Sequence, residues 1–388
     1  MIQRLLLVCF IFFVDNHICL SQVSIANPSS LNQDLTFNGT RVNPYDIDKD
    51  SAASIEITGY VDTYYALYSD SIPLDSYQKF PTVSPRNNQF GLNIAQVSAR
   101  YQSNRFRGVM TLFMGDIPNS SWSPRFNFIQ EANAGFKLSK NLWLDAGYFR
   151  THFGLESIQP RENMTLSVST TTFFEPYYLS GAKLTWEVNS KLTLQANVFN
   201  GYNNFVDNNT NKALGFSMVY LPNNNFSITY SNLISEETPG NAKGNRTRFY
   251  NNLFAVYKHQ RFTIGGDLNY SIQNHTSLST NDHQAMMFSL LLAAKYRITH
   301  QWGTYMRGEY FSDPDEMLTG PIQNDDNQLL GLRIGGLTAG FEFKPIPNAY
   351  FRMEGRWLDA RKEEHVFRFN GKPSHNRYEF LTGIGLWF

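Results

Sequence analysis

The sequence has almost no cysteine and no long apolar segment beyond its first residues. Both cysteines of the 388-residue chain, Cys9 and Cys19, lie close to its start. A disulfide framework or a thiolate metal site needs more cysteines than this, so neither is expected. A membrane-spanning helix needs about 20 consecutive apolar residues, and no such run follows Leu20. These two absences exclude small disulfide-rich proteins and helical membrane proteins.

An excess of charge of either sign is also missing. The chain carries 33 basic and 33 acidic residues and has a formal net charge of zero. Nucleic-acid binding depends on neutralising phosphates with a surplus of Lys and Arg, so we expect no nucleic-acid partner. The balance also argues against a strongly ion-selective surface.

The first residues have the pattern of a secretory signal peptide. Arg4 precedes an apolar run from Leu5 to Val14 that is too short to cross a bilayer. Small residues at Cys19 and Ser21 predict cleavage before Gln22; a buried strand or helix and a lipoprotein at Cys19 are the weaker alternatives. We therefore predict a signal peptide over residues 1–21. Residues 22–54, rich in Asn, Pro, Asp and Ser, are predicted to form a periplasmic lead-in.

From Ile55 to the end, residues 55–388, apolar and polar side chains alternate with the period of a half-buried strand. Between Leu192 and Val198, for example, apolar residues alternate with Thr193, Gln195 and Asn197. About sixteen segments show this pattern, each near the ten-residue length of a tilted membrane-spanning strand. The predicted strands span 55–68, 89–101, 106–116, 128–138, 142–150, 181–188, 192–200, 213–221, 226–233, 247–257, 262–271, 285–297, 302–311, 330–343, 349–358 and 377–388.

The connections between these segments alternate between short and long. Turns such as 139–141 and 258–261 are short, whereas 69–88, 151–180 and 359–376 are long. Outer-membrane barrels have short periplasmic turns and long external loops. The sequence therefore predicts an all-β fold: a transmembrane, antiparallel, up-and-down β-barrel of about 16 strands in the outer membrane of a Gram-negative bacterium. An even strand count places both termini in the periplasm.

Charged residues within the predicted strands fall on the face opposite the apolar one. A charge at the bilayer midplane costs about 2–4 kcal/mol in such barrels, so the apolar face is predicted to contact outer-membrane lipid and the charged face a wet interior. Eight aromatic residues near strand ends are expected to form girdles at the two interfaces: Tyr148, Tyr220, Tyr230, Tyr270, Tyr296, Trp302, Tyr310 and Trp357. The candidate lumen-lining residues are Lys183, Glu187, Lys295, Arg307, Glu309, Arg352, Glu354 and Arg356.

The lumen charges at positions 307, 309, 352, 354 and 356 lie on segments separated by one strand. They predict a mixed ion-pair network that lines the barrel wall. Simple salt bridges that hold the wall are the favoured interpretation, and a selective solute site is the alternative. The longest connection, 151–180, is a candidate to fold inward and constrict a pore; an external surface loop is the alternative. Its candidate constriction residues are His152, Glu156, Arg161, Glu162 and Glu175.

No catalytic or metal motif is present. The sequence contains no nucleophile elbow, phosphate-binding loop or zinc-protease helix, and its histidines show no ligand spacing. We expect no enzymatic activity, no cofactor and no metal; the alternative is a barrel enzyme that assembles Ser and His from separate strands.

Short stretches resemble known barrel families. ITGYVDTYYA (57–66), THFGLE (151–156) and FFEPYYLSG (173–181) resemble the OmpL-like β-barrel porins. AGYFRTHFGLE (146–156) also resembles phosphate-selective porins, but the loop that follows carries Arg161 as its one cation beside three glutamates, which puts phosphate selectivity in doubt. The final segment, NRYEFLTGIGLWF, resembles the C-terminal strand that targets barrels to the assembly machinery and ends on Phe388.

The resemblance implies a porin that lets small hydrophilic solutes diffuse passively through a water-filled barrel, which about sixteen strands are wide enough to enclose. Homotrimerisation is an expectation from other sixteen-stranded porins. The alternative is a non-conducting barrel that serves as an adhesin or structural anchor through its external loops.

Overall fold

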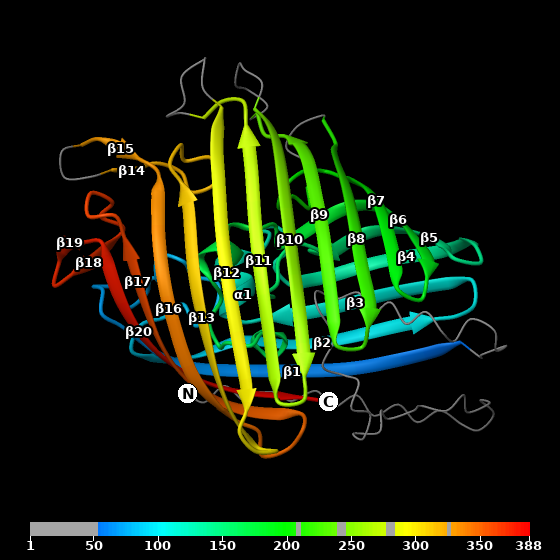
Figure 1. Ribbon diagram of the computed structural model, residues 1–388, viewed down its shortest axis with the longest axis horizontal. Helices are drawn as coiled ribbons and strands as arrows, with labels where there is room; N and C mark the ends of the chain where they lie inside the picture. The colour runs from blue at the N-terminus through cyan, green and yellow to red at the C-terminus, as the bar shows by residue number, and fades with distance from the viewer. Residues whose placement is uncertain (1–52, 207–210, 239–245, 277–283, 324–326) are drawn as a thin grey trace, which may run out of the picture.

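Sixteen antiparallel strands form a closed barrel, as the sequence predicts (Figure 1). The computed structural model describes residues 53–206, 211–238, 246–276, 284–323 and 327–388. Each barrel strand pairs with its neighbours along the chain, and β1 pairs with β20 to close the ring, with Tyr60 opposite Trp387. The predicted signal peptide (1–21) and nearly all of the predicted lead-in (22–54) lie outside the described residues.

The barrel strands lie where the alternating pattern places them, to within a few residues. They are β1 (Ser54–Tyr68), β2 (Gln89–Gln102), β3 (Phe106–Met114), β4 (Ile129–Ser139), β5 (Leu142–Arg150), β6 (Tyr178–Asn189), β7 (Leu192–Phe199), β8 (Ala213–Asn223), β9 (Phe226–Glu236), β10 (Thr247–His259), β11 (Phe262–Gln273), β12 (Ala285–Arg297), β13 (Trp302–Asp313), β16 (Leu332–Phe343), β17 (Ala349–Ala360) and β20 (Asn376–Trp387).

The remaining elements lie in the long connections. Two small hairpins pair β14 (Ile322–Gln323) with β15 (Leu329–Leu330) and β18 (Phe367–Phe369) with β19 (Lys372–Ser374). The short helices are α1 (Asp116–Ser121), η2 (Pro160–Glu162) and α2 (Thr170–Phe174). Among the described residues, no helix has the length and apolar character needed to cross a membrane.

The short turns are stabilised by side chains that bond to their own backbone. Asn189 Oδ1 accepts from the amides of Lys191 (2.8 Å) and Leu192 (3.1 Å) in the turn between β6 and β7. Asn223 Oδ1 accepts from the amides two and three residues ahead in the turn between β8 and β9. Thr299 Oγ1 accepts from the amides two and three residues ahead, at 3.2 and 3.0 Å. Asn and Thr side chains favour tight turns through such bonds, which explains why these connections are short.

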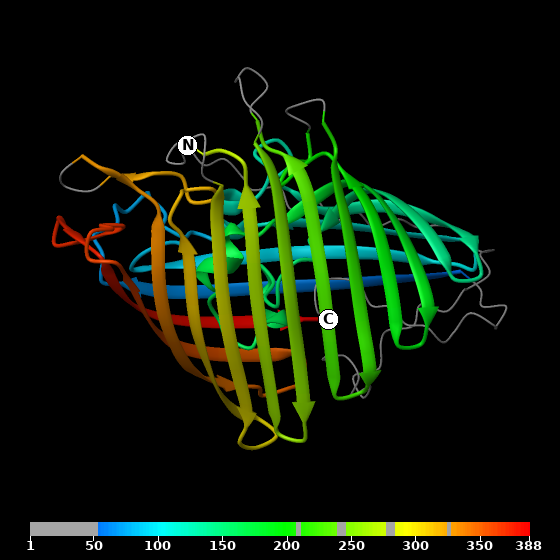
Figure 2. The ribbon, with the colours of Figure 1, turned by 45° about the horizontal axis from the view of Figure 1, so that its top comes forward.

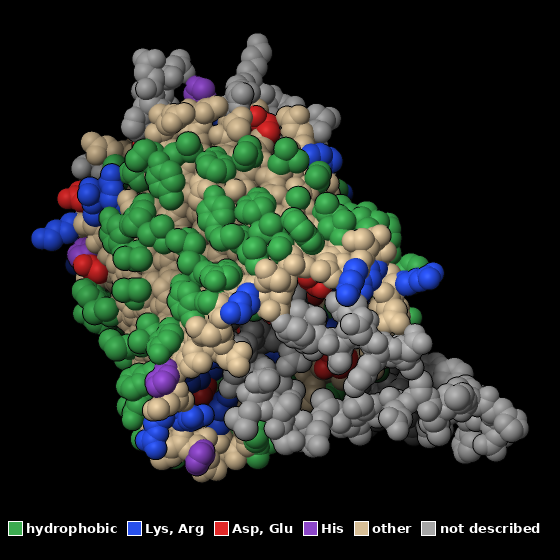
Figure 3. All heavy atoms as spheres, turned by 45° about the vertical axis from the view of Figure 1, so that its right-hand side comes forward, with side chains coloured by type: hydrophobic (Ala, Val, Ile, Leu, Met, Phe, Trp, Pro, Cys, Tyr) green, Lys and Arg blue, Asp and Glu red, His purple; other side chains and the backbone are tan. Residues whose placement is uncertain are grey.

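The outer surface of the barrel is apolar. Large hydrophobic side chains such as Leu292 and Leu337, each 58% exposed, point away from the barrel, and hydrophobic residues cover a broad band of the face in Figure 3. Five of the predicted girdle aromatics are exposed on this surface: Tyr220, Tyr270, Trp302, Tyr310 and Trp357. The prediction is wrong for Tyr148, whose ring stacks on Phe205 at 4.2 Å and packs in a buried cluster.

The interior differs from the uniformly wet lumen that the sequence predicts. Toward the short turns, the inward-facing residues Glu56, Gln102 and Ser139 are exposed. Toward the long loops, the lumen-facing positions become apolar and pack together in a buried cluster, which includes Phe149, Leu179, Phe199, Leu233, Met287, Phe311, Ile334 and Leu358. This half of the barrel therefore contains a hydrophobic core because connecting loops fold into it and exclude water.

Two long connections cover the long-loop end of this core. Phe80, from the segment between β1 and β2, makes edge contacts with Phe173 and Phe174 of α2 and with Phe367 of β18. The guanidinium of Arg377 lies 4.6 Å from the Phe367 ring centre and 5.8 Å from that of Phe80. The first and last connections thus pack against the segment that enters the barrel between β5 and β6.

Candidate functional site

The connection between β5 and β6, residues 151–177, lies inside the barrel and is called here the inward loop. In Figure 2 it is the green segment enclosed by the strands. It reaches β9 through the Ser231 hydroxyl, which donates to the His152 carbonyl at 3.3 Å, and β10 through the Gly154 amide, which donates to Asn252 at 3.0 Å. The bonds described below reach β11, β13 and β17.

The inward loop approaches the wall closely at two glycines. A Cβ built on Gly383 would lie 2.7 Å from the Leu166 side chain, and one on Gly265 would lie 2.8 Å from that of Leu155, so neither position has room for a larger residue.

Backbone amides of the inward loop donate to carboxylates on the barrel wall. The amide of Leu155 donates to Asp267 on β11 at 2.6 Å, and the amide of Thr170 donates to Glu309 on β13 at 2.6 Å. Glu354 on β17 accepts from the consecutive amides of residues 166 (2.7 Å) and 167 (3.1 Å). A buried backbone amide without a partner is costly, so these carboxylates replace the strand ladder that an irregular loop lacks.

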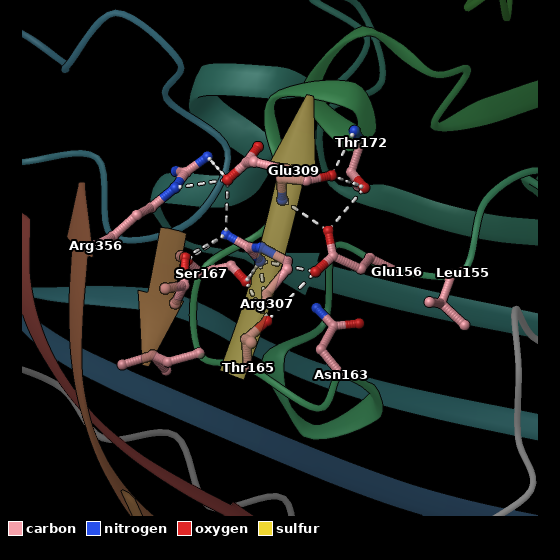
Figure 4. Close-up of polar contacts among 12 residues, drawn as sticks. Leu155, Glu156, Asn163, Thr165, Ser167, Thr172, Arg307, Glu309 and Arg356 are labelled. Carbon is pink, nitrogen blue, oxygen red and sulfur yellow. Dashed lines mark hydrogen bonds and ion pairs between the residues drawn. The ribbon is translucent and has the colours of Figure 1, made fainter. Parts of the chain in front are cut away.

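Arg307 on β13 is the centre of these contacts, as Figure 4 shows. Its Nη1 donates to Glu156 Oε1 (2.7 Å), to the Thr165 hydroxyl (2.9 Å) and to the Ser167 carbonyl (2.7 Å). Its Nη2 donates to the Ser167 hydroxyl at 3.0 Å and to Glu309 at 3.3 Å. The residue is 1% exposed. One guanidinium therefore joins two stretches of the inward loop to the wall.

Glu156 is the matching centre on the loop side. Besides Arg307, it accepts from the amide of Ser169 (2.6 Å) and the hydroxyl of Thr172 (3.0 Å). Ser169 is the N-cap of α2, and its own hydroxyl accepts from the Thr172 amide. The carboxylate thus holds the start of α2 against the stretch that carries Thr165.

Arg352 on β17 binds a second part of the inward loop. Its Nη1 donates to the carbonyls of Pro160 (2.7 Å) and Thr165 (2.8 Å), and its Nη2 donates to that of Asn163 (3.1 Å). Its charge is balanced by Glu342 at 2.7 Å, which also pairs with Lys295 at 2.7 Å. Together, Asp267, Arg307, Glu309, Arg352 and Glu354 are called here the clamp wall.

The structure brings the predicted lumen charges together, but in a different environment from the one expected. Arg356 pairs with Glu309 at 2.8 Å, and Arg307 is shared between Glu309 and Glu156. These groups are buried under the inward loop rather than lining water. Three site residues, Asp267, Glu342 and Arg150, were not predicted from the sequence. Asp267 and Glu342 lie on the charged face of their strands, which is a signal that could have found them, and Arg150 lies at the end of β5.

Two of the other four candidate residues of the inward loop, Arg161 and Glu162, have partners for their charge. Glu162 pairs with Arg150 at 2.5 Å, and Arg161 stacks on the Tyr60 ring at 4.6 Å. Burial raises the pKa of Glu162, but the charge of Arg150 outweighs it and holds that pKa below the usual range. Glu175 and His152 have no salt bridge to a group of the described chain.

The opposite side of the lumen has a different character. Lys183 and Glu187 on β6 and Gln195 and Asn197 on β7 are buried, and none of them makes a hydrogen bond to the inward loop. The Lys183 ammonium lies 4.3 Å from the centre of the Phe149 ring. With Glu131 on β4, Lys183, Gln195 and Asn197 are called here the facing wall.

We predict that replacing Arg307 by Met releases the inward loop. Removing one partner of a buried ion pair leaves the other charge uncompensated and costs about 3–5 kcal/mol, and here both Glu156 and Glu309 lose a partner. The free energy of unfolding, measured by urea titration in lipid vesicles, should fall by that amount. In Arg368→Gln, where an exposed arginine of β18 is changed, it should change by less than about 0.5 kcal/mol. Equal losses in both variants would contradict the assigned role.

We also predict that Glu175 makes stability depend on pH. Burial, followed by the charge of Asp267, raises the pKa of Glu175 well above its ordinary value. A carboxyl with a raised pKa in the folded state binds its proton more tightly there than in the unfolded chain. Its contribution to the free energy of unfolding is therefore fully present at acid pH and is lost as pH rises through the raised pKa. Glu175→Gln should therefore match the wild type below about pH 4.3 and become progressively more stable than it at higher pH. A difference that stays constant across this range would contradict the prediction.

Comparison with solved structures shows the same fold in outer-membrane proteins. An in-vitro folded OmpT of Vibrio cholerae in its trimer form has a TM-score of 0.58 at 10% identity, with 87% of this chain and 100% of that chain covered. An anion-selective porin from Comamonas acidovorans has the same score, identity and coverage. The outer-membrane channel DcaP of Acinetobacter baumannii has a TM-score of 0.58 at 9% identity, covering 87% and 99%. No curated protein matches the sequence.

A family model matches residues 54–388, the whole of the barrel, and its description is "Putative beta-barrel porin-2, OmpL-like". The match agrees with the resemblance seen in the sequence and points to a channel of the Gram-negative outer membrane rather than to an enzyme. The chain belongs to this family of OmpL-like β-barrel porins.

Proposed function

We propose that the protein lets small hydrophilic solutes diffuse passively through a narrow passage between the inward loop and the facing wall. The observation that carries this proposal is the asymmetry of the lumen. On the clamp wall, carboxylates and guanidinium groups bind the backbone of the inward loop. On the facing wall, Gln195 Oε1 and both amide atoms of Asn197 are buried without a hydrogen-bond partner among the described residues, and polar groups of this kind are normally satisfied by water.

The inward loop then acts as the constriction, with a mixed local charge. Glu156 and Glu162 are neutralised by Arg307 and Arg150, so they add little field. Lys183 and Glu187 on β6 carry opposite charges toward the passage. We therefore expect weak ion selectivity, since the field at a constriction follows the sum of nearby fixed charges.

A non-conducting barrel is the second candidate, and one observation favours it. The lumen-facing strand residues of the hydrophobic core described above are called here the apolar ring. This ring, at the long-loop end, packs against Phe153 of the inward loop, Phe80 and Phe367. If this core extends across the whole section of the barrel, solutes do not pass, and the external loops are the place where an adhesin or anchor would act.

The family and the fold support a proposal for topology and assembly. We propose that the short turns and both termini face the periplasm and that the long connections face outward, as in outer-membrane barrels. Phe388 bonds to Gly59 across the barrel closure through both backbone groups, at 3.0 and 3.1 Å, and we propose that it guides recognition by the barrel-assembly machinery. A homotrimer is proposed because the similar OmpT barrel exists in a trimer form.

The pore is tested by recording single-channel currents after refolding the mature chain into planar bilayers. We predict discrete current steps and a reversal potential near zero under a salt gradient. The natural cysteines lie in the predicted signal peptide, so the mature chain provides a thiol-free background for labelling. A negatively charged methanethiosulfonate reagent should reduce the current of Gln195→Cys on the facing wall and leave that of Thr338→Cys, beside Arg307, unchanged.

Thr338 is a matched control because both side chains are buried and face the lumen, at 7% exposure for Gln195 and 3% for Thr338. Equal current loss in both variants would show that the passage is not confined to the facing wall. A correctly folded barrel without current would contradict the pore and favour the non-conducting alternative.

A further inference from the structure

The facing wall contains buried polar atoms that no protein group satisfies. Within the described residues, this holds for Glu131 Oε2, Gln195 Oε1, both amide atoms of Asn197 and both ring nitrogens of His152. Each of these four residues is at most 8% exposed. The Lys183 ammonium, 7% exposed, has no carboxylate of the described chain within ion-pair distance. Buried polar groups are nearly always paired, so a group of several such atoms without protein partners marks a place for water or a polar solute.

These residues lie close together on neighbouring strands. Asn197 is the cross-strand partner of Lys183, and Gln195 is that of Thr185 two positions along β6. The ring of His152 lies 5.9 Å from that of Phe199, whose face the Lys183 ammonium also approaches at 5.9 Å. The ammonium, the amide and the imidazole therefore border one small region of the lumen.

Glu131 supplies the opposite charge near the same aromatic ring. The Lys183 ammonium extends over Phe149 at 4.3 Å. Ala132 is the cross-strand partner of Tyr148, so Glu131, which precedes Ala132, and Phe149, which follows Tyr148, lie next to each other on antiparallel strands. One oxygen of Glu131 accepts from Asn133 at 3.2 Å, and the other has no partner. A cation and an anion thus lie near one ring without forming an ion pair with each other.

Two other sets of lumen charges are arranged differently, although Asp145 of the first set is the cross-strand partner of Lys183. Arg107 pairs with Asp145, and Lys295 pairs with Glu342 at 2.7 Å. An unpaired charge in a buried position is costly, so separated charges are stable there when a ligand or water lies between them. A simple anion would pair with the Lys183 ammonium but would be repelled by the Glu131 carboxylate. A simple cation would pair with Glu131 but would be repelled by Lys183.

His152 adds a neutral donor and acceptor to the region. Burial, followed by the charge of Lys183, lowers the pKa of His152 well below its ordinary value. A neutral imidazole offers one hydrogen-bond donor and one acceptor, so it does not change the balance of one positive and one negative charge.

We propose that Lys183, Asn197 and Glu131 form a binding site for small zwitterionic solutes of the α-amino acid class. The carboxylate of the solute binds the Lys183 ammonium and the Asn197 amide, its ammonium binds Glu131, and its side chain contacts the Phe149 ring. This inference rests on the proposed pore, because the site lies in the passage between the inward loop and the facing wall.

The test measures uptake of radiolabelled L-alanine into proteoliposomes that contain the refolded mature chain. L-Lactate, which lacks the ammonium group, and glycerol, which is uncharged and of similar size, are measured in parallel. Alanine uptake should saturate with concentration and exceed that of both comparison solutes. A hydrogen bond to a charged group contributes about 1.5–3 kcal/mol, so Lys183→Met and Glu131→Gln should each lower saturable uptake by about tenfold or more.

Lys137→Met is the matched control, because Lys137 is another lumen lysine, on β4 nearer the short turns, whose ammonium lies 5.4 Å from the Trp143 ring. This variant should keep alanine uptake within about twofold of the wild type. Folding of every variant is checked by the shift in gel mobility on heating and by its single-channel current. A conducting channel whose alanine uptake neither saturates nor responds to Lys183→Met would overturn this inference alone. A folded protein without ionic current would overturn the pore itself, and the site with it.

Discussion

The structure depends on one buried interaction, in which the guanidinium of Arg307 pairs with Glu156 and Glu309. The same guanidinium also donates to a backbone carbonyl and to hydroxyl groups of the inward loop. An irregular segment inside a barrel has no strand partner, so each of its buried amides and carbonyls needs another group. The clamp wall supplies these groups from β11, β13 and β17. The position of the inward loop therefore follows from charges fixed on rigid strands, which hold side chains more accurately than loops do.

This interaction also explains how the lumen divides into two sides. The clamp wall uses its charges to bind the inward loop, whereas on the facing wall Glu131 Oε2, Gln195 Oε1 and both amide atoms of Asn197 have no hydrogen-bond partner among the described residues. The apolar ring at the long-loop end forms because the inward loop brings Phe153 and α2 into contact with Phe80 and Phe367. A barrel of this strand number is wide enough for water, and the inward loop narrows it.

Most of the fold could be predicted from the sequence, because alternation and loop length are local signals. Charges at positions 307, 309 and 356 lie on the predicted parity and meet as an ion-pair network. The partners of these charges could not be predicted. Glu354 binds the amides of residues 166 and 167, nearly 190 residues away in the sequence, and a backbone amide has no side-chain signature. The apolar ring could not be predicted for a similar reason. Leu233 and Leu358 lie on the lumen-facing side of their strands, and they can form a hydrophobic core only when a loop fills the lumen.

Amide hydrogen exchange of the inward loop, measured in lipid nanodiscs, tests the clamp most directly. The account predicts that the amides of Leu155, Leu166 and Thr170, which donate to wall carboxylates, exchange as slowly as those of the barrel strands. Exchange follows the free energy of local opening, so rates as fast as those of the exposed residues Lys362 and Glu363 would show that the loop is not held against the wall and would contradict the account.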